Sequence, residues 1–230
     1  MITQLFLAIF PVIILALYVY IQDANKEPWK LLLKAFIFGM LSAVSTLALL
    51  SPVPRNYFYQ INIPAVNAVL DSFCFAAIPE ETLKFLFLFL LIWWNKEFDE
   101  FMDGIVYSVF VSLGFAAFEN VLYLYNSSTF HAIARGIFSV PGHFLFAVVM
   151  GYYFALGKFS KKFYLKIYYL LFGLLFAIVM HGVFDSILGI KELASSVNSY
   201  LGIFVFIIFI IFDIVIWRVA VKKIQNRPMP

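Results

Sequence analysis

Ionisable side chains lie in the middle of long apolar stretches of this sequence, where they need a partner. They are Glu80, Glu81, Lys84, Glu119, His143, His181 and Asp185. Placing one charged side chain at the centre of a membrane helix costs about 2.5–3.5 kcal/mol on insertion scales. Several of them facing lipid would prevent insertion. We therefore expect these side chains to face the interior of a helix bundle and to satisfy one another.

The segment PEETLK places two acids and one base on the same side of a helix. Lys84 follows Glu80 by four residues and Glu81 by three, so its ammonium group can neutralise either carboxylate. Two adjacent carboxylates in a low dielectric repel each other, which favours proton uptake by one of them. General acid–base catalysis needs a carboxyl group that exchanges a proton near neutral pH. Glu80 and Glu81 are therefore candidate catalytic residues.

Three further motifs place polar groups in separate apolar stretches. The segment HGVFD puts His181 and Asp185 four residues apart, so Asp185 can orient the imidazole or share a metal with it. The segment FAAFEN carries Glu119 and Asn120, and His143 follows a Pro-Gly pair. We predict Glu119, His143 and His181 as further catalytic residues, with Asn120 and Asp185 in support.

The composition decides the class of protein. Hydrophobic residues make up 64% of the 230 residues and charged residues only 13%, against about 45–50% and about 25% in soluble domains. The mean hydropathy is +0.96. Such a chain cannot present a polar surface to water, which excludes a soluble enzyme and a disordered regulator. The net charge of +3 is too small to indicate a nucleic-acid partner. The lipid bilayer is the predicted surrounding.

Seven stretches reach the roughly 20 apolar residues that a membrane helix needs. They are Ile2–Ile21, Leu31–Leu50, Ala65–Trp94, Phe101–Tyr125, Phe130–Leu156, Phe163–Leu188 and Leu201–Val219. We predict an all-α, polytopic helix bundle of about seven transmembrane helices, and the pattern also admits an eighth. It forms one domain over residues 1–230, with a motif-bearing core at about 65–190. The third stretch is longer than one straight crossing requires and contains Pro79, so a tilted, kinked or broken helix is expected there.

The basic residues predict the orientation in the membrane. Most Lys and Arg residues fall in the connections on one side, which should be cytoplasmic. The N-terminus should then lie outside and the C-terminus in the cytoplasm. At 1.5 Å per residue, the four motifs lie about 21–27 Å from the cytoplasmic ends of their helices. They should therefore form one layer in the outer half of the bilayer, around a pocket open to the outside.

The ordered set of motifs resembles the PrsW family of intramembrane proteases. The resemblance rests on Glu80-Glu81-x-x-Lys84, on Glu119-Asn120 after FAAF, and on HGVFD. The stretches DANKEPWK, DGIVYSVFVSLGFAAFEN and SVPGHFLFAVVMGYY are similar to that family as well. The related CAAX- and bacteriocin-processing proteases use EExxxR, FxxxH and HxxxN/D motifs. Lys84 at the shorter spacing and Glu119 in place of histidine favour PrsW.

The resemblance implies an endopeptidase in the bacterial cell membrane. Members of the family make the site-1 cut in a membrane-spanning anti-sigma factor, on its extracytoplasmic side, in response to envelope stress. The implied partner is such a membrane-anchored protein substrate.

Arg135 is a further candidate and lies in the outer part of the fifth stretch. There its guanidinium can bind the outer ends of helices or a carbonyl or carboxylate group of a substrate.

Two mechanisms fit this inventory. In the first, Glu80 or Glu81 acts as a general base on water and His181 with its neighbours stabilises the oxyanion, without a metal. In the second, a divalent metal such as zinc is held by some of Glu119, His143, His181 and Asp185, and a glutamate activates water. No helix carries two histidines at ligand spacing, which favours the metal-free version slightly.

Other classes of function use similar residues. Intramembrane Glu, His and Asp also build the proton relays of transporters and channels, although the sequence shows no inverted repeat of broken helices. A CAAX-type prenyl-protein protease would need an isoprenoid pocket with a cytoplasmic mouth, against the predicted orientation. The sequence leaves the cleavage site, the activating signal and the oligomeric state open.

Overall fold

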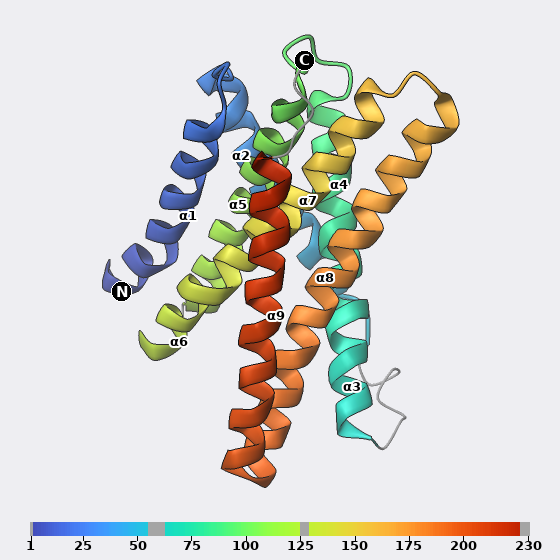
Figure 1. Cartoon of the computed structure of the whole chain (residues 1–230). Helices are drawn as coiled ribbons and strands as arrows, with labels where there is room; N and C mark the ends of the chain where they lie inside the picture. The colour runs from blue at the N-terminus through green and yellow to red at the C-terminus, as the bar shows by residue number, and fades with distance from the viewer. Residues whose placement is uncertain (1, 55–62, 125–128, 226–230) are drawn as a thin grey trace.

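The computed structural model describes residues 2–54, 63–124 and 129–225, and this part of the chain is helical without a strand (Figure 1). Its elements are α1 (Ile2–Gln22), α2 (Trp29–Leu50), α3 (Pro64–Leu70), η2 (Asp71–Ala77), α4 (Ile78–Ile92), α5 (Phe101–Leu124), α6 (Thr129–Ala134), η3 (Arg135–Ser139), α7 (Val140–Phe159), α8 (Phe163–Val197) and α9 (Ser199–Gln225). The elements α3, η2 and α4 follow one another without a break, and so do α6, η3 and α7.

The seven predicted helical segments are confirmed, and the all-α bundle with them. Five described helices are long and apolar enough to cross a membrane, and Ile9–Gln22 is a shorter apolar helix. Tyr125, the predicted end of the fourth segment, lies outside the described residues. Figure 1 shows α1 beginning at the left, about half-way down the view, and α9 running from the lower end into the upper half. Which end faces the cytoplasm stays a prediction from the basic residues.

Both prolines inside the motif-bearing segments stand two residues after the end of a π-helical stretch. Pro79 comes after η2 and Pro141 after η3. A proline cannot donate the ordinary helical hydrogen bond, and its ring clashes with the carbonyl four residues earlier. A wider π turn relieves this clash and rotates the following residues relative to an unbroken helix. The kink or break predicted at Pro79 is thus a change of helix type, and it sets the direction of the motif residues that follow.

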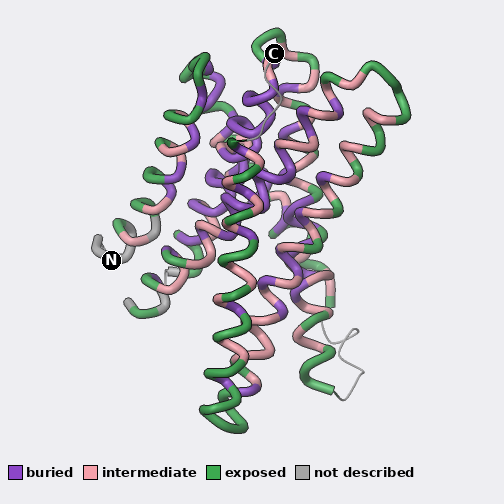
Figure 2. Tube along the Cα trace, in the orientation of Figure 1, coloured by how far each residue is buried: buried purple, intermediate pink, exposed green. Residues whose placement is uncertain are grey.

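Helix α5 lies inside the bundle, and α9 lies on its outer face with most of its residues exposed or half-buried (Figure 2). In the most apolar part of each helix, 72% of the residues of α5 are buried but only 17% of those of α9. Glycines allow α5 to lie very close to its neighbours. A Cβ atom on Gly114 would lie 2.0 Å from the carbonyl oxygen of Phe36 in α2. A Cβ atom on Gly151 of α7 would lie 2.3 Å from the carbonyl oxygen of Gly104 in α5. Such close packing of small residues is what holds membrane helices together.

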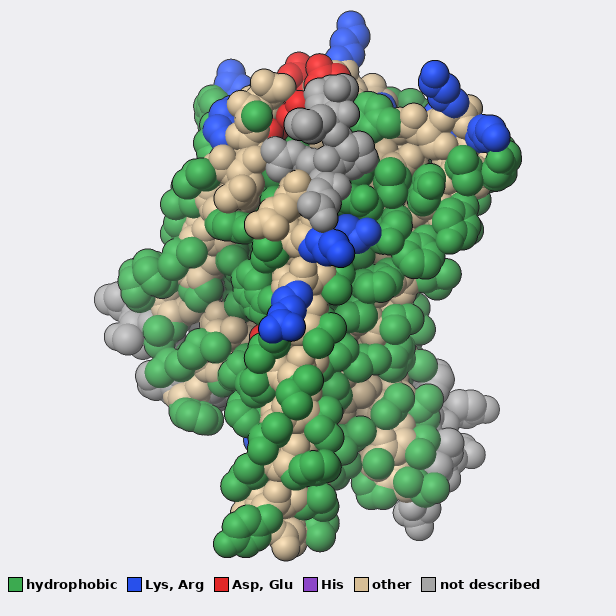
Figure 3. Space-filling model, in the orientation of Figure 1, with side chains coloured by type: hydrophobic (Ala, Val, Ile, Leu, Met, Phe, Trp, Pro, Cys, Tyr) green, Lys and Arg blue, Asp and Glu red, His purple; other side chains and the backbone are tan. Residues whose placement is uncertain are grey.

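The outer surface of the bundle is apolar along most of its height (Figure 3). Large hydrophobic side chains such as Phe204 (60% exposed) and Ile211 (57% exposed) stand on it. Charged side chains gather mainly at the upper end in this view. An apolar belt with a charged end is the surface that a bilayer requires.

Candidate active site

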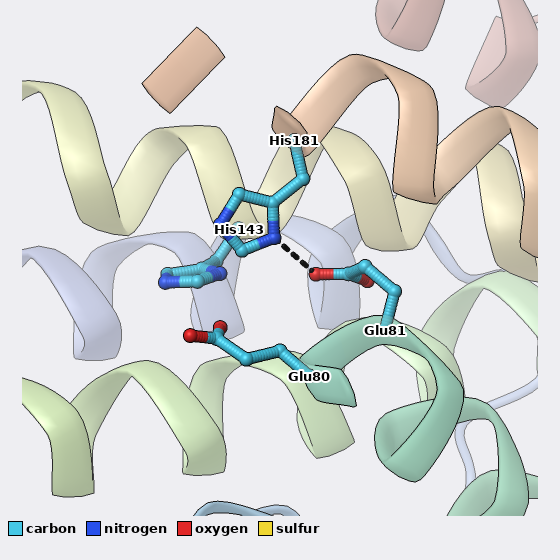
Figure 4. Close-up of side chains that lie close together, drawn as sticks. All are labelled: Glu80, Glu81, His143 and His181. Atoms are coloured by element: carbon cyan, nitrogen blue, oxygen red, sulfur yellow. Dashed lines mark hydrogen bonds and ion pairs between the residues drawn. The ribbon is translucent and has the colours of Figure 1, made fainter. Parts of the chain in front are cut away.

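A compact cluster of ionisable side chains lies inside the bundle where three helices meet (Figure 4). Glu80 and Glu81 come from α4, His143 from α7 and His181 from α8. One donor atom from each of the four lies within 4.8 Å of those of the others. All four are buried, with exposed fractions from 1% for Glu81 to 8% for Glu80. The sequence predicted that these motifs would converge, and they do.

Lys84 is the internal cation of this cluster. Its Nζ donates a hydrogen bond to Glu81 Oε1 at 2.7 Å and lies 3.5 Å from Glu80 Oε2, as the helical spacing predicted. The same ammonium lies 3.0 Å from His143 Nδ1 and 3.9 Å from the centre of the Phe115 ring. Lys84 is only 2% exposed, so these contacts replace the water that an ammonium group normally binds.

Both ring nitrogens of each histidine are engaged. His143 Nε2 lies 3.0 Å from Glu119 Oε2, while its Nδ1 faces Lys84. Because an ammonium only donates, Nδ1 accepts and Nε2 carries the proton, which describes a neutral ring. His181 faces a carboxylate on both sides, with Nδ1 2.8 Å from Glu81 and Nε2 3.1 Å from Asp185. A ring that donates from both nitrogens is an imidazolium.

Arg135 closes the cluster on the side of Glu119. Its Nη2 lies 3.0 Å from Glu119 Oε2, and its Nε donates to Asn120 Oδ1 at 2.8 Å. The guanidinium also stacks 4.1 Å above the ring of Tyr123. Arg135 is the first residue of η3, so the π-helical stretch is what brings it against α5. This arrangement fixes Glu119, which in turn orients His143.

The charges of the cluster allow it to exchange protons for a cation. The four carboxyl groups of Glu80, Glu81, Glu119 and Asp185 face the cations Lys84, Arg135 and the imidazolium of His181. The charges balance when one carboxyl group carries a proton, and the cluster can take up a cation when that proton and one proton of His181 leave. The buried Oε2 of Glu81 also has no hydrogen-bond partner. Two histidines with carboxylates form a recurring zinc ligand set, so the residues fit a divalent metal.

A cavity of about 950 Å³ opens from this cluster toward the turn between α8 and α9. Glu80, Glu119, His143 and His181 line its inner end, whereas Glu81 is not part of its wall. Its sides carry Phe138, Phe184 and Phe206, and its outer end carries Lys191, Ser195 and Ser199. This volume is at the upper end of the range for ligand-binding pockets, so a peptide segment can reach the cluster.

The comparisons with known proteins agree with this geometry. A model of the family described as PrsW family intramembrane metalloprotease matches residues 27–214. The chain belongs to the PrsW family. The Protease PrsW of Geobacillus kaustophilus is 34% identical over 224 residues, which cover 94% of this chain and 88% of that protein. The Protease PrsW of Clostridioides difficile is 32% identical over 227 residues, which cover 96% of this chain and 89% of that protein. No solved structure matches.

This membership confirms the resemblance that the motifs indicated, and it makes the chain a protease of an intramembrane metalloprotease family. All nine residues predicted for the site lie in one connected network. The predicted metal-ligand set shares His143 and His181 with the compact cluster. The other two members, Glu119 and Asp185, each bind one histidine ring instead of joining that cluster, which contains Glu80 and Glu81.

The motif FAAFEN contained Phe115 without giving it a role, and the sequence reasoning missed Tyr123. Phe115 lies under the Lys84 ammonium and Tyr123 lies under the Arg135 guanidinium. Both lie on α5 at one helical turn from Glu119, before and after it, and that spacing is a readable signal. In a chain with 29 Phe and 13 Tyr, however, aromatic residues at helical spacing are too common to single out Tyr123.

Proposed function

We propose that this PrsW-family protein hydrolyses a peptide bond of a single-pass membrane protein in the outer half of the bilayer. The observation that carries the proposal is the position of the compact Glu–His cluster at the inner end of a cavity of about 950 Å³. The cavity opens at the α8–α9 turn, the opposite end from the lysine-rich connections. The rule that basic loops stay in the cytoplasm therefore puts its mouth outside.

Glu80 is the general base in this proposal. It lines the cavity and has only a 3.5 Å contact with Lys84, so its carboxylate can reach a water beside a bound peptide. Glu81 is held between Lys84 at 2.7 Å and His181 at 2.8 Å, away from the cavity wall. In the reaction, Glu80 takes a proton from a water molecule while the oxygen of that water attacks the scissile carbonyl carbon. It then returns that proton to the leaving amine.

Glu81, His143 and His181 would hold a divalent metal of the zinc class once Lys84 has left His143 Nδ1 and His181 has given up a proton. When bound, such an ion supplies a Lewis acid and makes water more acidic. Lys84 keeps Glu81 in position, while Glu119 and Asp185 orient the two histidine rings. Arg135 stands on the cavity wall beside Glu119 and provides positive charge for the developing oxyanion.

The substrate we propose is an anti-sigma factor, cut at its extracytoplasmic side as a first step in an envelope stress response in the bacterial cell membrane. This part rests on the resemblance of the motifs to the family. The apolar walls of the cavity, with Phe138 and Phe206 from η3 and α9, suit a segment that leaves a transmembrane helix. The serines and the lysine at the outer end suit the polar residues that follow it.

The test is cleavage of a single-pass anti-sigma substrate by purified full-length protein in liposomes, with bound metal measured by mass spectrometry. Glu80→Gln should lower the cleavage rate by about 10²–10⁴-fold and keep the metal. Glu81→Gln should lose both activity and metal, because it removes a ligand. Glu97→Gln, an exposed residue of the α4–α5 connection, is the matched control and should behave like wild type.

Two results would contradict the proposal. Glu80→Gln cutting at the wild-type rate would show that another group is the base. Wild-type protein that cuts at full rate after chelation, with no metal left, would show that Glu80 works in the metal-free mechanism. Cleavage products sequenced by mass spectrometry give the position of the cut relative to the transmembrane segment, which tests the predicted side.

A further inference from the structure

A second buried cluster of acids lies at the opposite end of the bundle from the cavity mouth. Asp23 and Glu27 belong to the connection between α1 and α2, and Asp103 lies in the first turn of α5. Their exposed fractions are 2%, 7% and 0%. Glu100, just before α5, is half-buried beside them. Charges in loops are normally solvated, so the burial of these carboxyl groups needs a physical reason.

The carboxyl groups of this acidic cluster are arranged in two pairs. Asp23 lies beside Glu100, and Glu27 lies beside Asp103. Tyr107 of α5 donates its hydroxyl hydrogen bond to Glu27 Oε2. Asp103 Oδ2 caps the start of α5 by accepting hydrogen bonds from the backbone N–H groups of residues 99 and 100, at 3.0 and 2.7 Å. The cluster therefore joins the α1–α2 connection to the N-terminal end of α5.

No ion pair joins these acids to a side-chain cation among the described residues. The ammonium of Lys26, which follows Asp23 closely in sequence, donates to backbone carbonyls, at 2.5 Å for Tyr20 and 3.2 Å for Ile21 and also to that of Asp23, and it acts on the Asp23 carboxyl only from a distance. The ion pairs found between described residues all belong to the Glu–His cluster. Neither carboxylate oxygen of Asp23 receives a hydrogen bond from an N–H or hydroxyl group, and neither does Oδ1 of Asp103, so these groups face the carboxyl groups of Glu100 and Glu27.

Two adjacent buried carboxylates repel each other and are too costly to stay ionised alone, so each pair holds either a proton or a cation. We propose that this acidic cluster binds a partly hydrated divalent cation, of which Mg²⁺ is the natural occupant. Oxygen-only donors are what Mg²⁺ prefers, and it usually takes one or two carboxylates directly while keeping several waters.

The spacing of the donors limits how such an ion can be held. Among the described residues, only the Glu–His cluster brings three or more donor atoms within 4.8 Å of one another. The acidic cluster is wider than that. A bare ion surrounded by protein ligands would not fit it, whereas an ion that reaches the second carboxyl pair through water would. Half-buried Glu100 leaves a side from which ion and water can enter.

The test is thermal unfolding of the full-length protein in detergent after chelation and dialysis, with MgCl₂ as the probe and NaCl of matched ionic strength as reference. At about 100 times its dissociation constant, Mg²⁺ should raise the midpoint by about 5–10 °C. Asp23→Asn should weaken Mg²⁺ binding at least tenfold, measured by calorimetry. Glu192→Gln, an exposed acid at the other end of the molecule, is the matched control and should keep the full shift.

Two further variants separate this site from the Glu–His cluster and from a failure to fold. Glu81→Gln damages the Glu–His cluster and should leave the Mg²⁺ shift intact. Glu27→Gln tests the second carboxyl pair and should weaken binding if Asp23→Asn gives no folded protein. The proposal is overturned if wild type shows no shift beyond that of NaCl. It is also overturned if Asp23→Asn stabilises the protein and leaves Mg²⁺ binding unchanged, because protons then neutralise the cluster.

Discussion

The two buried clusters of this PrsW-family protein solve the same problem in different ways. The Glu–His cluster mixes signs, since Lys84, Arg135 and His181 lie among its carboxylates at 2.7–3.5 Å. The acidic cluster has one sign, and its nearest ammonium, that of Lys26, binds backbone carbonyls. A mixed cluster can stay assembled before any ligand arrives. In a cluster of carboxylates alone, the negative charge has to be neutralised from solution, by protons or by a cation.

This difference matches the positions of the clusters in the bundle. The proteolytic centre that we propose has to stay folded when it is empty, because the cavity is the route that the described residues provide for water and ions. Lys84 supplies the standing positive charge there, and it is completely enclosed by protein groups. The acidic cluster lies at the end of the bundle, beside the half-buried Glu100. The half-buried Glu100 gives ions in the surrounding solution a way to reach it.

Removing the internal cation should therefore have the largest effect on the fold. Lys84→Met leaves Glu80 and Glu81 adjacent, buried and without their counter-charge. Breaking a buried ion pair by deleting one partner costs about 3–5 kcal/mol, so the unfolding midpoint in chelator should fall strongly. Zinc should restore more stability in this variant than in wild type, because the cluster now depends on an added cation. The exposed Lys34→Met on α2 is the control. Equal midpoints for both variants would refute the role of Lys84.

Much of this architecture could be predicted from the sequence because the bilayer limits the choices. A span needs about 20 apolar residues, so seven apolar stretches gave seven helical segments. The convergence of Glu80, His143 and His181 followed from their similar depth along their helices. That argument needs only the rise per residue and the cost of a charge in lipid.

The rest depends on rotations that sequence spacing does not reveal. The stretches η2 and η3 turn the residues after them, and this decides that Glu80 faces the cavity while Glu81 faces Lys84. A pattern argument treats the two adjacent glutamates alike. The acidic cluster was missed for another reason. Asp23 and Glu27 lie in a polar connection, where charges are solvated by default, and only the folded chain buries them against Asp103.

A smaller change tests the acidic cluster without altering its charge. Tyr107→Phe removes the hydroxyl that donates to Glu27 Oε2. Losing the partner of a buried group costs about 1–3 kcal/mol, so the variant should be less stable than wild type in chelator. Mg²⁺ should reduce the difference, because the ion compensates the same carboxylate. Tyr200→Phe, at a side chain that is 83% exposed, should have no effect. A Tyr107→Phe protein as stable as wild type would show that Glu27 does not need this donor.

The smallest expected effect is a pH dependence that belongs to the acidic cluster alone. Burial, then the neighbouring Glu100 and Glu27, raise the pKa of Asp23 from 3.8 to about 6, although Lys26 opposes the shift. Between about pH 4 and 6, the folded chain therefore binds more protons at Asp23 than the unfolded chain does. The stability from this group is complete below pH 4 and is lost as the pH rises through 6.

The measurement compares wild type with Asp23→Asn in the presence of a chelator. The unfolding midpoint of wild type minus that of the variant should decrease as the pH is raised from 4.5 to 6.5. Saturating Mg²⁺ should flatten this difference, since the ion favours the ionised carboxylate. A difference that rises with pH in chelator would mean that Asp23 is already compensated by a group of the protein, which would make the two clusters alike.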